Sequence, residues 1–258
     1  MKKKLQNRWT KVKNTLFPDN LMGDIFSFIA AFIVAFLFLQ TLGFFLDTQT
    51  PLVVIESESM LHQPGWQSWH SENGLPHDSY PFGGGINIGD ISLVKGDSPE
   101  DIQIGDVIVY NKIVGLNTLH PIIHRVVGVV EVGEDIRTEG AVKFSENKLR
   151  VPCNYNSRSG YDLDSIKTYY SKFKDFNIET FRLFITKGDN NAQTDQCLIS
   201  SKPTISMPVH ESLLVGKSKF NIPFLGNVKL AFICGANYLS GNVCPSRCWW
   251  TRNNPGCN

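Results

Sequence analysis

The chain has 258 residues, which is long enough for one membrane anchor and one domain that can bury its own core. Its formal net charge is +1, and no basic stripe with interleaved aromatic side chains runs along it. We therefore expect no nucleic-acid partner. The basic residues are concentrated at one end, because residues 1–20 contain six Lys and Arg side chains against the single carboxylate of Asp19.

An uncharged segment at residues 25–46 follows the basic tail of residues 1–24. As a helix it would be about 33 Å long, which is sufficient to cross the hydrocarbon core of a bilayer. A buried core helix is the plain alternative, but apolar side chains lie on every face. A cleaved signal peptide would have a shorter apolar core that ends at small residues. We predict a retained transmembrane helix, with the basic tail in the cytoplasm and the chain after Asp47 on the outer side.

Short apolar segments separated by turns dominate residues 47–221, and this spacing is typical of an all-β domain. The segments are residues 52–55, 91–94, 107–110, 122–130, 181–186 and 213–215. Residues 61–87 and 131–180 are interpreted as inserted loops or a subdomain. Residues 222–258 are apolar at first and then Cys-rich. We expect residues 222–239 to pack on the domain or to lie on the membrane rather than to form a second span.

The predicted orientation places all six cysteines on the outer side, where disulfides can form. Four of them crowd the end of the chain, namely Cys234, Cys244, Cys248 and Cys257. The paired spacing of a zinc knuckle is absent, so we predict disulfides. Their connectivity stays open.

Three polar motifs lie at or within apolar segments, and each is weak alone. The first is Glu-Ser-Glu-Ser-Met at residues 56–60, although serines at a strand end are usually turn residues. The second is His124-Arg125 within an apolar segment, where a lone histidine is usually a satisfied core residue. The third is Thr-Lys-Gly-Asp-Asn-Asn at residues 186–191 followed by Asp195, which alone is typical of a polar turn.

Together and in this order, these motifs resemble the signal peptidase I family. The features that carry the resemblance are the anchor, Ser-x-Ser-Met, Gly-Asp-Val-Ile-Val-Tyr at residues 105–110, His-Arg-Val-Val-Gly at residues 124–128 and Lys-Gly-Asp-Asn-Asn at residues 187–191. The histidine of the His-Arg-Val-Val-Gly motif resembles the archaeal and endoplasmic-reticulum branch of the family. The typical bacterial branch uses a Ser–Lys dyad instead. The resemblance covers the anchor and residues 51–60, 88–130 and 181–216, and it implies a signal-peptidase-like β domain.

The resemblance also implies roles for four residues. Ser59 is expected to be the nucleophile and His124 its general base. Asp195 is expected to orient the imidazole, and Asp189 is the fallback for that role or a supporting acid. These residue types suit the chemistry, because a serine hydroxyl needs a positioned base and an imidazole can act as one near neutrality.

Oxyanion and substrate binding are assigned to Ser57 and Met60, with the Ser57 hydroxyl acting beside the Ser59 N–H. The chain departs from the family at Leu61-His62, where an acidic residue and proline often stand. The interval between His124 and Asp189 is also long for the endoplasmic-reticulum branch. These departures leave the substrate preference open.

The insert at residues 61–87 is rich in histidine and aromatic side chains. His62, His70 and His77 are irregularly spaced, and we predict neither a metal nor a cofactor. Trp66 and Trp69 are either interfacial anchors or ordinary packing under a loop. Lys112 lies outside the His-Arg pair, and we expect it to be dispensable for activity.

The resemblance predicts a membrane-anchored serine endopeptidase that removes signal peptides from secretory preproteins, with small apolar side chains at the first and third positions before the cut. Its expected partners are preproteins and the lipid bilayer, with other secretion-machinery subunits as further candidates. One alternative is a membrane-anchored, non-catalytic β domain that binds a protein partner. Another is a self-cleaving repressor-type peptidase of the same fold, but this sequence offers no DNA-binding segment.

Overall fold

The computed structural model describes residues 21–62, 64–114, 117–153, 160–197 and 207–231. The chain divides into two compact units, residues 1–51 and 52–258. The predicted basic tail lies largely outside the described residues, as do Cys234, Cys244, Cys248 and Cys257.

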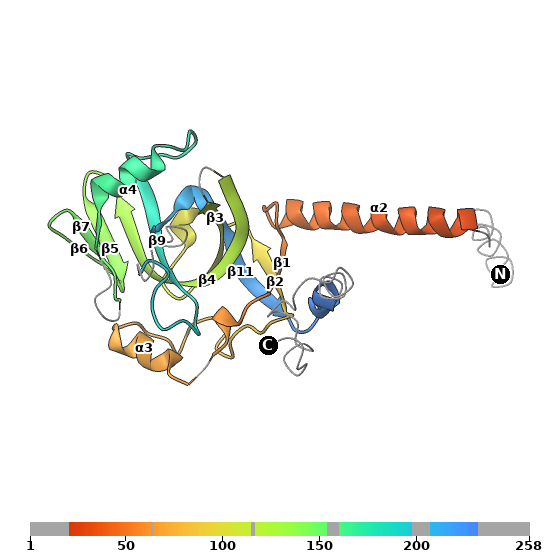
Figure 1. Ribbon diagram of the computed structural model, residues 1–258, viewed down its shortest axis with the longest axis horizontal. Helices are drawn as coiled ribbons and strands as arrows, with labels where there is room; N and C mark the ends of the chain where they lie inside the picture. Colours follow the sequence, from red (N-terminus) through yellow and green to blue (C-terminus); the bar gives the residue numbers. More distant parts are fainter. Residues whose placement is uncertain (1–20, 63, 115–116, 154–159, 198–206, 232–258) are drawn as a thin grey trace, which may run out of the picture. The chain divides into compact units, whose positions relative to one another are not determined.

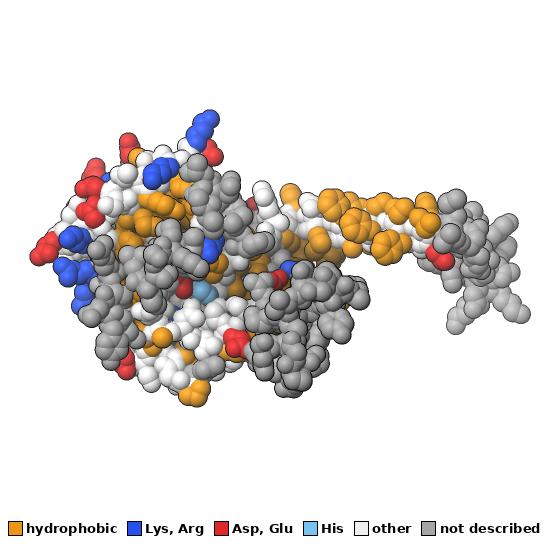
Figure 2. All heavy atoms as spheres, viewed as in Figure 1, with side chains coloured by type: hydrophobic (Ala, Val, Ile, Leu, Met, Phe, Trp, Pro, Cys, Tyr) orange, Lys and Arg blue, Asp and Glu red, His pale blue; other side chains and the backbone are white. Residues whose placement is uncertain are grey.

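The first unit contains helix α2 (Leu21–Phe45), which begins earlier than the predicted start at residue 25. Its exposed side chains are mainly apolar, and hydrophobic side chains cover the face of the helix that Figure 2 shows. Within it the Ser27 hydroxyl donates to Gly23 O (2.7 Å) and the Thr41 hydroxyl to Leu37 O (2.8 Å), so both polar groups are satisfied inside the helix. Among the described residues, α2 is the helix long and apolar enough to cross a membrane, which confirms that part of the prediction.

The second unit is built mainly of β-strands, which confirms the predicted fold class in its coarse form (Figure 1). The larger sheet has the order β1-β2-β11-β3-β4-β9-β10, with β5 also paired to β4, and its described pairs are antiparallel. Its strands are β1 (Leu52–Val54), β2 (Ile91–Lys95), β3 (Val107–Val114), β4 (Asn117–Val132), β5 (Ile136–Gly140), β9 (Phe181–Lys187), β10 (Val209–His210) and β11 (Leu214–Ile222). Each predicted apolar segment overlaps one of these strands.

The insert at residues 131–180 is a small structured region rather than a set of loops. After β5, a second antiparallel sheet contains β6 (Lys143–Ser145), β7 (Lys148–Arg150) and β8 (Gly160–Asp162), followed by α4 (Leu163–Tyr170). The Asp162 carboxylate accepts a hydrogen bond from Ser165 N (3.0 Å), which satisfies a free N–H at the start of α4.

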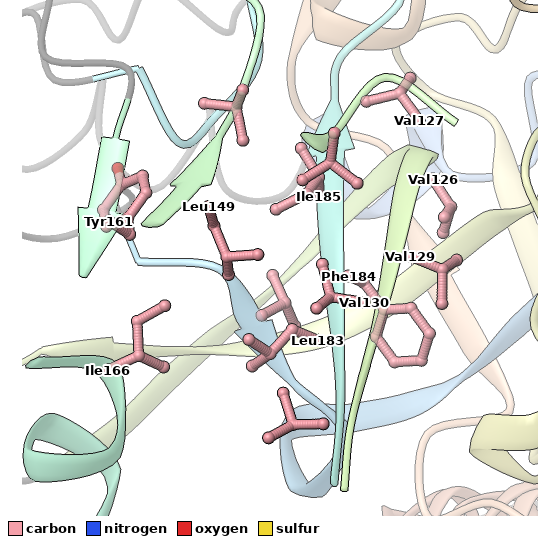
Figure 3. Packing of buried hydrophobic residues seen from close by; sticks show 14 of the residues in the cluster. Val126, Val127, Val129, Val130, Leu149, Tyr161, Ile166, Leu183, Phe184 and Ile185 are labelled. Carbon is pink, nitrogen blue, oxygen red and sulfur yellow. The ribbon is translucent and has the colours of Figure 1, made fainter. Parts of the chain in front are cut away.

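A single large apolar cluster joins this insert to the main sheet (Figure 3). Strands β4 and β9 supply its centre, and Leu149, Tyr161 and Ile166 reach it from the insert. The central members are Val126, Val127, Val129, Val130, Leu183, Phe184 and Ile185. Because both faces of β4 are covered, its apolar run is continuous rather than alternating.

Besides α4 and the helical residues 227–231, the described part of this domain contains three short helical turns and one helix. They are η1 (Glu58–Met60), η2 (Pro99–Asp101), η3 (Glu211–Leu213) and α3 (Trp66–Glu72), the last of which lies in the insert at residues 61–87. A disulfide joins Cys153 to Cys197, so both described cysteines are paired. In the segment predicted to pack on the domain or lie on the membrane, Leu230 is buried and Val228 is exposed, and residues 232–239 lie outside the described residues.

Candidate active site

Ser59 lies in η1, directly beyond edge strand β1. Backbone hydrogen bonds from Ile55 N to Asp90 O and from Gly89 N to Ile55 O, both 2.9 Å, fix the chain that leaves β1. Met60 is fully buried beside Ile55 in a small apolar cluster. These contacts hold both ends of the segment and leave Ser59 half-buried between them.

His124 and Arg125 are neighbours on β4, so strand geometry directs their side chains to opposite faces. In the register of the sheet, His124 lies opposite Ile108 of β3, and Arg125 lies opposite Lys187 of β9. The two side chains of the His-Arg pair therefore contact different parts of the domain. His124 faces Ser59, and Arg125 faces the turn that follows β9.

The structure brings Ser59, His124 and Asp195 into a line of hydrogen bonds. Ser59 Oγ lies 3.0 Å from His124 Nε2, and His124 Nδ1 lies 2.5 Å from Asp195 Oδ2. The side chains of His124 and Asp195 are 8% and 5% exposed. With Nδ1–H donated to the carboxylate, Nε2 can accept the serine proton, which is the geometry required for nucleophilic acyl transfer.

Asp195 is held by the end of β9 and by β3. Its backbone N–H donates to Thr186 O (2.9 Å), and its Oδ2 accepts hydrogen bonds from the hydroxyls of Thr186 (2.8 Å) and Tyr110 (3.3 Å). Burial and the Asp195 carboxylate raise the pKa of Tyr110 well above its usual value, so its hydroxyl stays a donor. The carboxylate is thereby fixed in the orientation that His124 needs.

Asp189 occupies a different position from Asp195. Its two oxygens accept hydrogen bonds from Arg125 Nε (2.8 Å) and Nη2 (2.7 Å), and its Oδ2 is 2.8 Å from His62 Nε2. Burial alone would raise the pKa of Asp189, but the hydrogen bonds and charges of Arg125 and His62 lower it to about 2. The geometry thus separates the two acids: Asp195 contacts His124, whereas Asp189 contacts Arg125 and His62.

Ser57 and Met60, the two residues assigned to oxyanion and substrate binding, differ from each other in exposure. Ser57 is exposed, and its hydroxyl lies 3.1 Å from Ser59 Oγ. Met60 is fully buried against Ile86 and Val107, so it anchors η1 rather than lying open to a substrate. Sequence reasoning missed this role, because a methionine beside a polar motif gives no sign of which way it points.

Lys187 is a residue that the sequence analysis did not single out. It is buried, and desolvation lowers its pKa to about 8 although Asp189 and Asp195 oppose that shift. Its Nζ donates to the carbonyls of Gly188 (3.1 Å) and Asp189 (3.3 Å). The available signal was a lysine at the end of the apolar segment at residues 181–186, beside the Gly-Asp turn. Lys112, which is expected to be dispensable for activity, belongs to β3.

The insert at residues 61–87 lies against the site through aromatic rings. The Trp66 ring stacks on His62 at 3.8 Å between centroids, and Trp69 lies 4.8 Å from Lys187 Nζ. Both tryptophans are half-buried and pack against residues near the site. Among the described residues, no group of three or more His, Cys, Asp or Glu side chains could hold a metal ion.

No protein-family model and no curated protein sequence matches this chain.

Proposed function

We propose that this chain is a membrane-anchored serine endopeptidase of the signal peptidase I kind, which removes signal peptides from secretory preproteins. The observation that carries the proposal is the line of hydrogen bonds from Ser59 through His124 to Asp195. A serine is a weak nucleophile unless a base takes its proton, and here a base and its orienting acid are both in reach.

In the proposed reaction, Ser59 Oγ attacks the scissile carbonyl while His124 Nε2 takes its proton. His124 then protonates the leaving amine, and Asp195 stabilises the imidazolium formed in between. The Ser57 hydroxyl and the Ser59 N–H stabilise the oxyanion. Water then attacks the acyl-enzyme ester while His124 Nε2 takes its proton. His124 returns that proton to Ser59 Oγ as the acyl chain leaves, which restores the serine.

The position of β1 supports an extended peptide as substrate. This strand lies at the edge of the larger sheet and leads directly to Ser57 and Ser59. A peptide pairing with an exposed edge gains main-chain hydrogen bonds, and its alternate side chains point the same way. Small residues at the first and third positions before the cut fit this mode.

Helix α2 supports action at a membrane surface, because few residues separate Phe45 from β1. We propose that the basic tail stays in the cytoplasm and the β domain lies on the outer side. Added protease should then digest a tag at residue 258 and spare one at residue 1. The reverse pattern would contradict this orientation.

Incubation of the purified full-length chain in detergent with a labelled preprotein tests the proposed activity. We expect cleavage after the signal peptide and no cleavage by Ser59→Ala, with helix content and solubility unchanged. A bulky residue placed at the first position before the cut should prevent cleavage. If wild type binds the preprotein without cutting it, the chain is instead a non-catalytic binding domain.

A further inference from the structure

Thr186 lies near the end of β9, beyond the residues of that strand that pair with β10. The pairing with β10 involves Leu183 and Phe184. Backbone groups of alternate residues in a strand point to the same side, so the N–H and C=O of Thr186 point toward the side of β9 on which β10 lies. A later segment takes the place of β10 there. The Asp195 N–H donates to Thr186 O (2.9 Å), and the Thr186 N–H donates to the side-chain Oε1 of Gln196 (3.0 Å).

This backbone contact determines the orientation of the Gln196 amide. A backbone N–H donates, so the side-chain atom that faces Thr186 N is the amide oxygen. The amide nitrogen therefore faces the Thr186 hydroxyl, with Nε2 at 3.4 Å from Oγ1. Because an amide nitrogen donates and an ionised carboxylate accepts, the hydroxyl hydrogen of Thr186 is directed away from Gln196 and onto Asp195 Oδ2, at 2.8 Å.

Two hydroxyls thus converge on the carboxylate oxygen that His124 contacts. Thr186 and Tyr110 both donate to Asp195 Oδ2, and this oxygen lies 2.5 Å from His124 Nδ1. The Thr186 hydroxyl also lies 3.2 Å from the Tyr110 hydroxyl, but its shorter contact to a charged oxygen is the stronger one. Gln196 and Thr186 are both fully buried, so bulk water does not compete for these hydrogen bonds.

The insert at residues 131–180 holds Gln196 from another direction. The Tyr161 hydroxyl donates to the backbone oxygen of Gln196, and burial raises the pKa of Tyr161, so this hydroxyl stays a donor. The next residue, Cys197, is joined by the disulfide to Cys153. The segment that carries Asp195 is therefore attached to β9 by the side chain of Gln196 and to the insert by its backbone.

We propose that Gln196 is a positioning residue for Asp195. Its amide directs the Thr186 hydroxyl onto the carboxylate and so fixes the oxygen that orients His124. A side chain needs both an acceptor and a donor at its end to bind the N–H and the hydroxyl of Thr186. Glutamate offers two acceptors and would draw the hydroxyl hydrogen away from Asp195, and methionine offers neither contact. For its effect on catalysis the inference rests on the proposed function.

The contact between His124 and Asp195 can be measured without any assay of activity. A histidine N–H that donates to a carboxylate over a short distance gives a proton resonance far downfield of other imidazole signals. The full chain is labelled with ¹⁵N-histidine in detergent micelles, and His124→Gln identifies the signal by removing it. We expect the signal in wild type and its loss or upfield movement in Gln196→Met and Thr186→Val. A wild type without the signal, or a signal unchanged in both variants, would overturn the inference.

A matched control lies in the same turn. Gln193 is the same residue type, and among the described residues its buried Oε1 has no hydrogen-bond partner. Gln193→Met should therefore leave both the downfield signal and kcat close to those of wild type. A loss of the signal in Gln193→Met as large as that in Gln196→Met would show that any change in this turn displaces Asp195, which contradicts a specific role for Gln196.

Kinetics on the preprotein separate a positioning role from a merely structural one. Gln196→Met and Thr186→Val should each lower kcat by about 10- to 100-fold with little change in KM. Gln196→Glu keeps the acceptor for the Thr186 N–H, so no buried N–H is left unpaired, and it should still lower kcat. Thr186→Ser keeps the hydroxyl and should stay close to wild type. An unchanged kcat in both Gln196→Met and Gln196→Glu would contradict the proposal.

The double variant tests whether Gln196 acts through the hydroxyl of Thr186. If it does, Gln196→Met adds little further loss of kcat once Thr186→Val has removed that hydroxyl. Two losses that multiply in full would show that the residues act independently and would overturn the inference. A wild type that cleaves nothing contradicts the proposed function and leaves the downfield proton signal to decide the role of Gln196.

Discussion

Replacing Asp189 by asparagine tests whether this acid stabilises the fold rather than taking part in the proton relay. The substitution removes the charge opposite Arg125, whose side chain is 0% exposed. Breaking a buried ion pair on one side typically costs about 3–5 kcal/mol. The lowering of the Asp189 pKa from 3.8 to about 2 gives a similar scale, about 2–3 kcal/mol at neutral pH. We therefore expect Asp189→Asn to lower the free energy of unfolding by about 3 kcal/mol.

The pH dependence of this effect has a definite sign. A carboxylate whose pKa is lowered in the folded state stabilises the fold above its unfolded pKa and loses that contribution as the pH falls. The difference between wild type and Asp189→Asn should accordingly be full near neutrality and should shrink between about pH 4 and pH 2.

Urea unfolding of the full chain in detergent, followed by tryptophan fluorescence, measures the difference, since Trp66 lies 5.9 Å from Arg125. Glu146→Gln is the control, because its ion pair with Arg150 is exposed and should contribute less than about 1 kcal/mol. The double variant Arg125→Met with Asp189→Leu should recover part of the loss. A cost below about 1 kcal/mol for Asp189→Asn, or one that does not change with pH, would refute the reasoning.

Four further outcomes are expected. His124→Ala should lose cleavage of the preprotein by about 10⁴-fold, whereas Lys187→Met should keep it within about tenfold; the opposite result would make lysine the base. Gly188→Ala would place Cβ 2.7 Å from a carbonyl oxygen of the nucleophile segment and should lower kcat by about 10²-fold, while Gly84→Ala, with open space around it, should not. Replacing Cys197 by serine removes a disulfide between positions 44 residues apart and should lower the free energy of unfolding, measured in urea, by about 4 kcal/mol. A variant as stable as wild type would contradict a stabilising role for this disulfide. Reductant should lower the stability of wild type more than that of Cys197→Ser, and an equal effect on the two, with reduction of the Cys153–Cys197 bond verified by thiol labelling, would contradict this contribution.

Local sequence patterns indicate much of this architecture, because they depend on neighbouring residues. The uncharged run of α2 and the apolar strands are visible as runs, and His124 stands out as a polar residue inside one. Ser59 lies in η1 after β1, His124 lies within β4 and Asp195 follows β9, and the order of the three motifs was the indication in the sequence that these residues belong together. Pairing across the sheet, by contrast, depends on residues that are distant in sequence.

The features that the sequence does not indicate are those set by packing between distant segments. Nothing near His62 reveals that it meets Asp189, because the contact spans 127 positions. Met60 looks like part of a polar motif until its pocket of apolar neighbours is known. The choice between Asp189 and Asp195 likewise depends on which carboxylate the turn directs to His124.

The place of β11 in the larger sheet has a consequence for how the chain reaches its native state. This strand comes last in the sheet's sequence order, and it lies between β2 and β3. Until residues 214–222 have emerged and inserted, β2 and β3 have no partner on the sides that face each other. Such unpaired edges are templates for aggregation, and long-range pairing of this kind is slow. Synthesis of the chain must therefore run almost to residue 222 before β1, which leads to Ser59, and β4, which carries His124, belong to one sheet. A chain that ends before β11 would expose two strand edges and would not hold these two residues together.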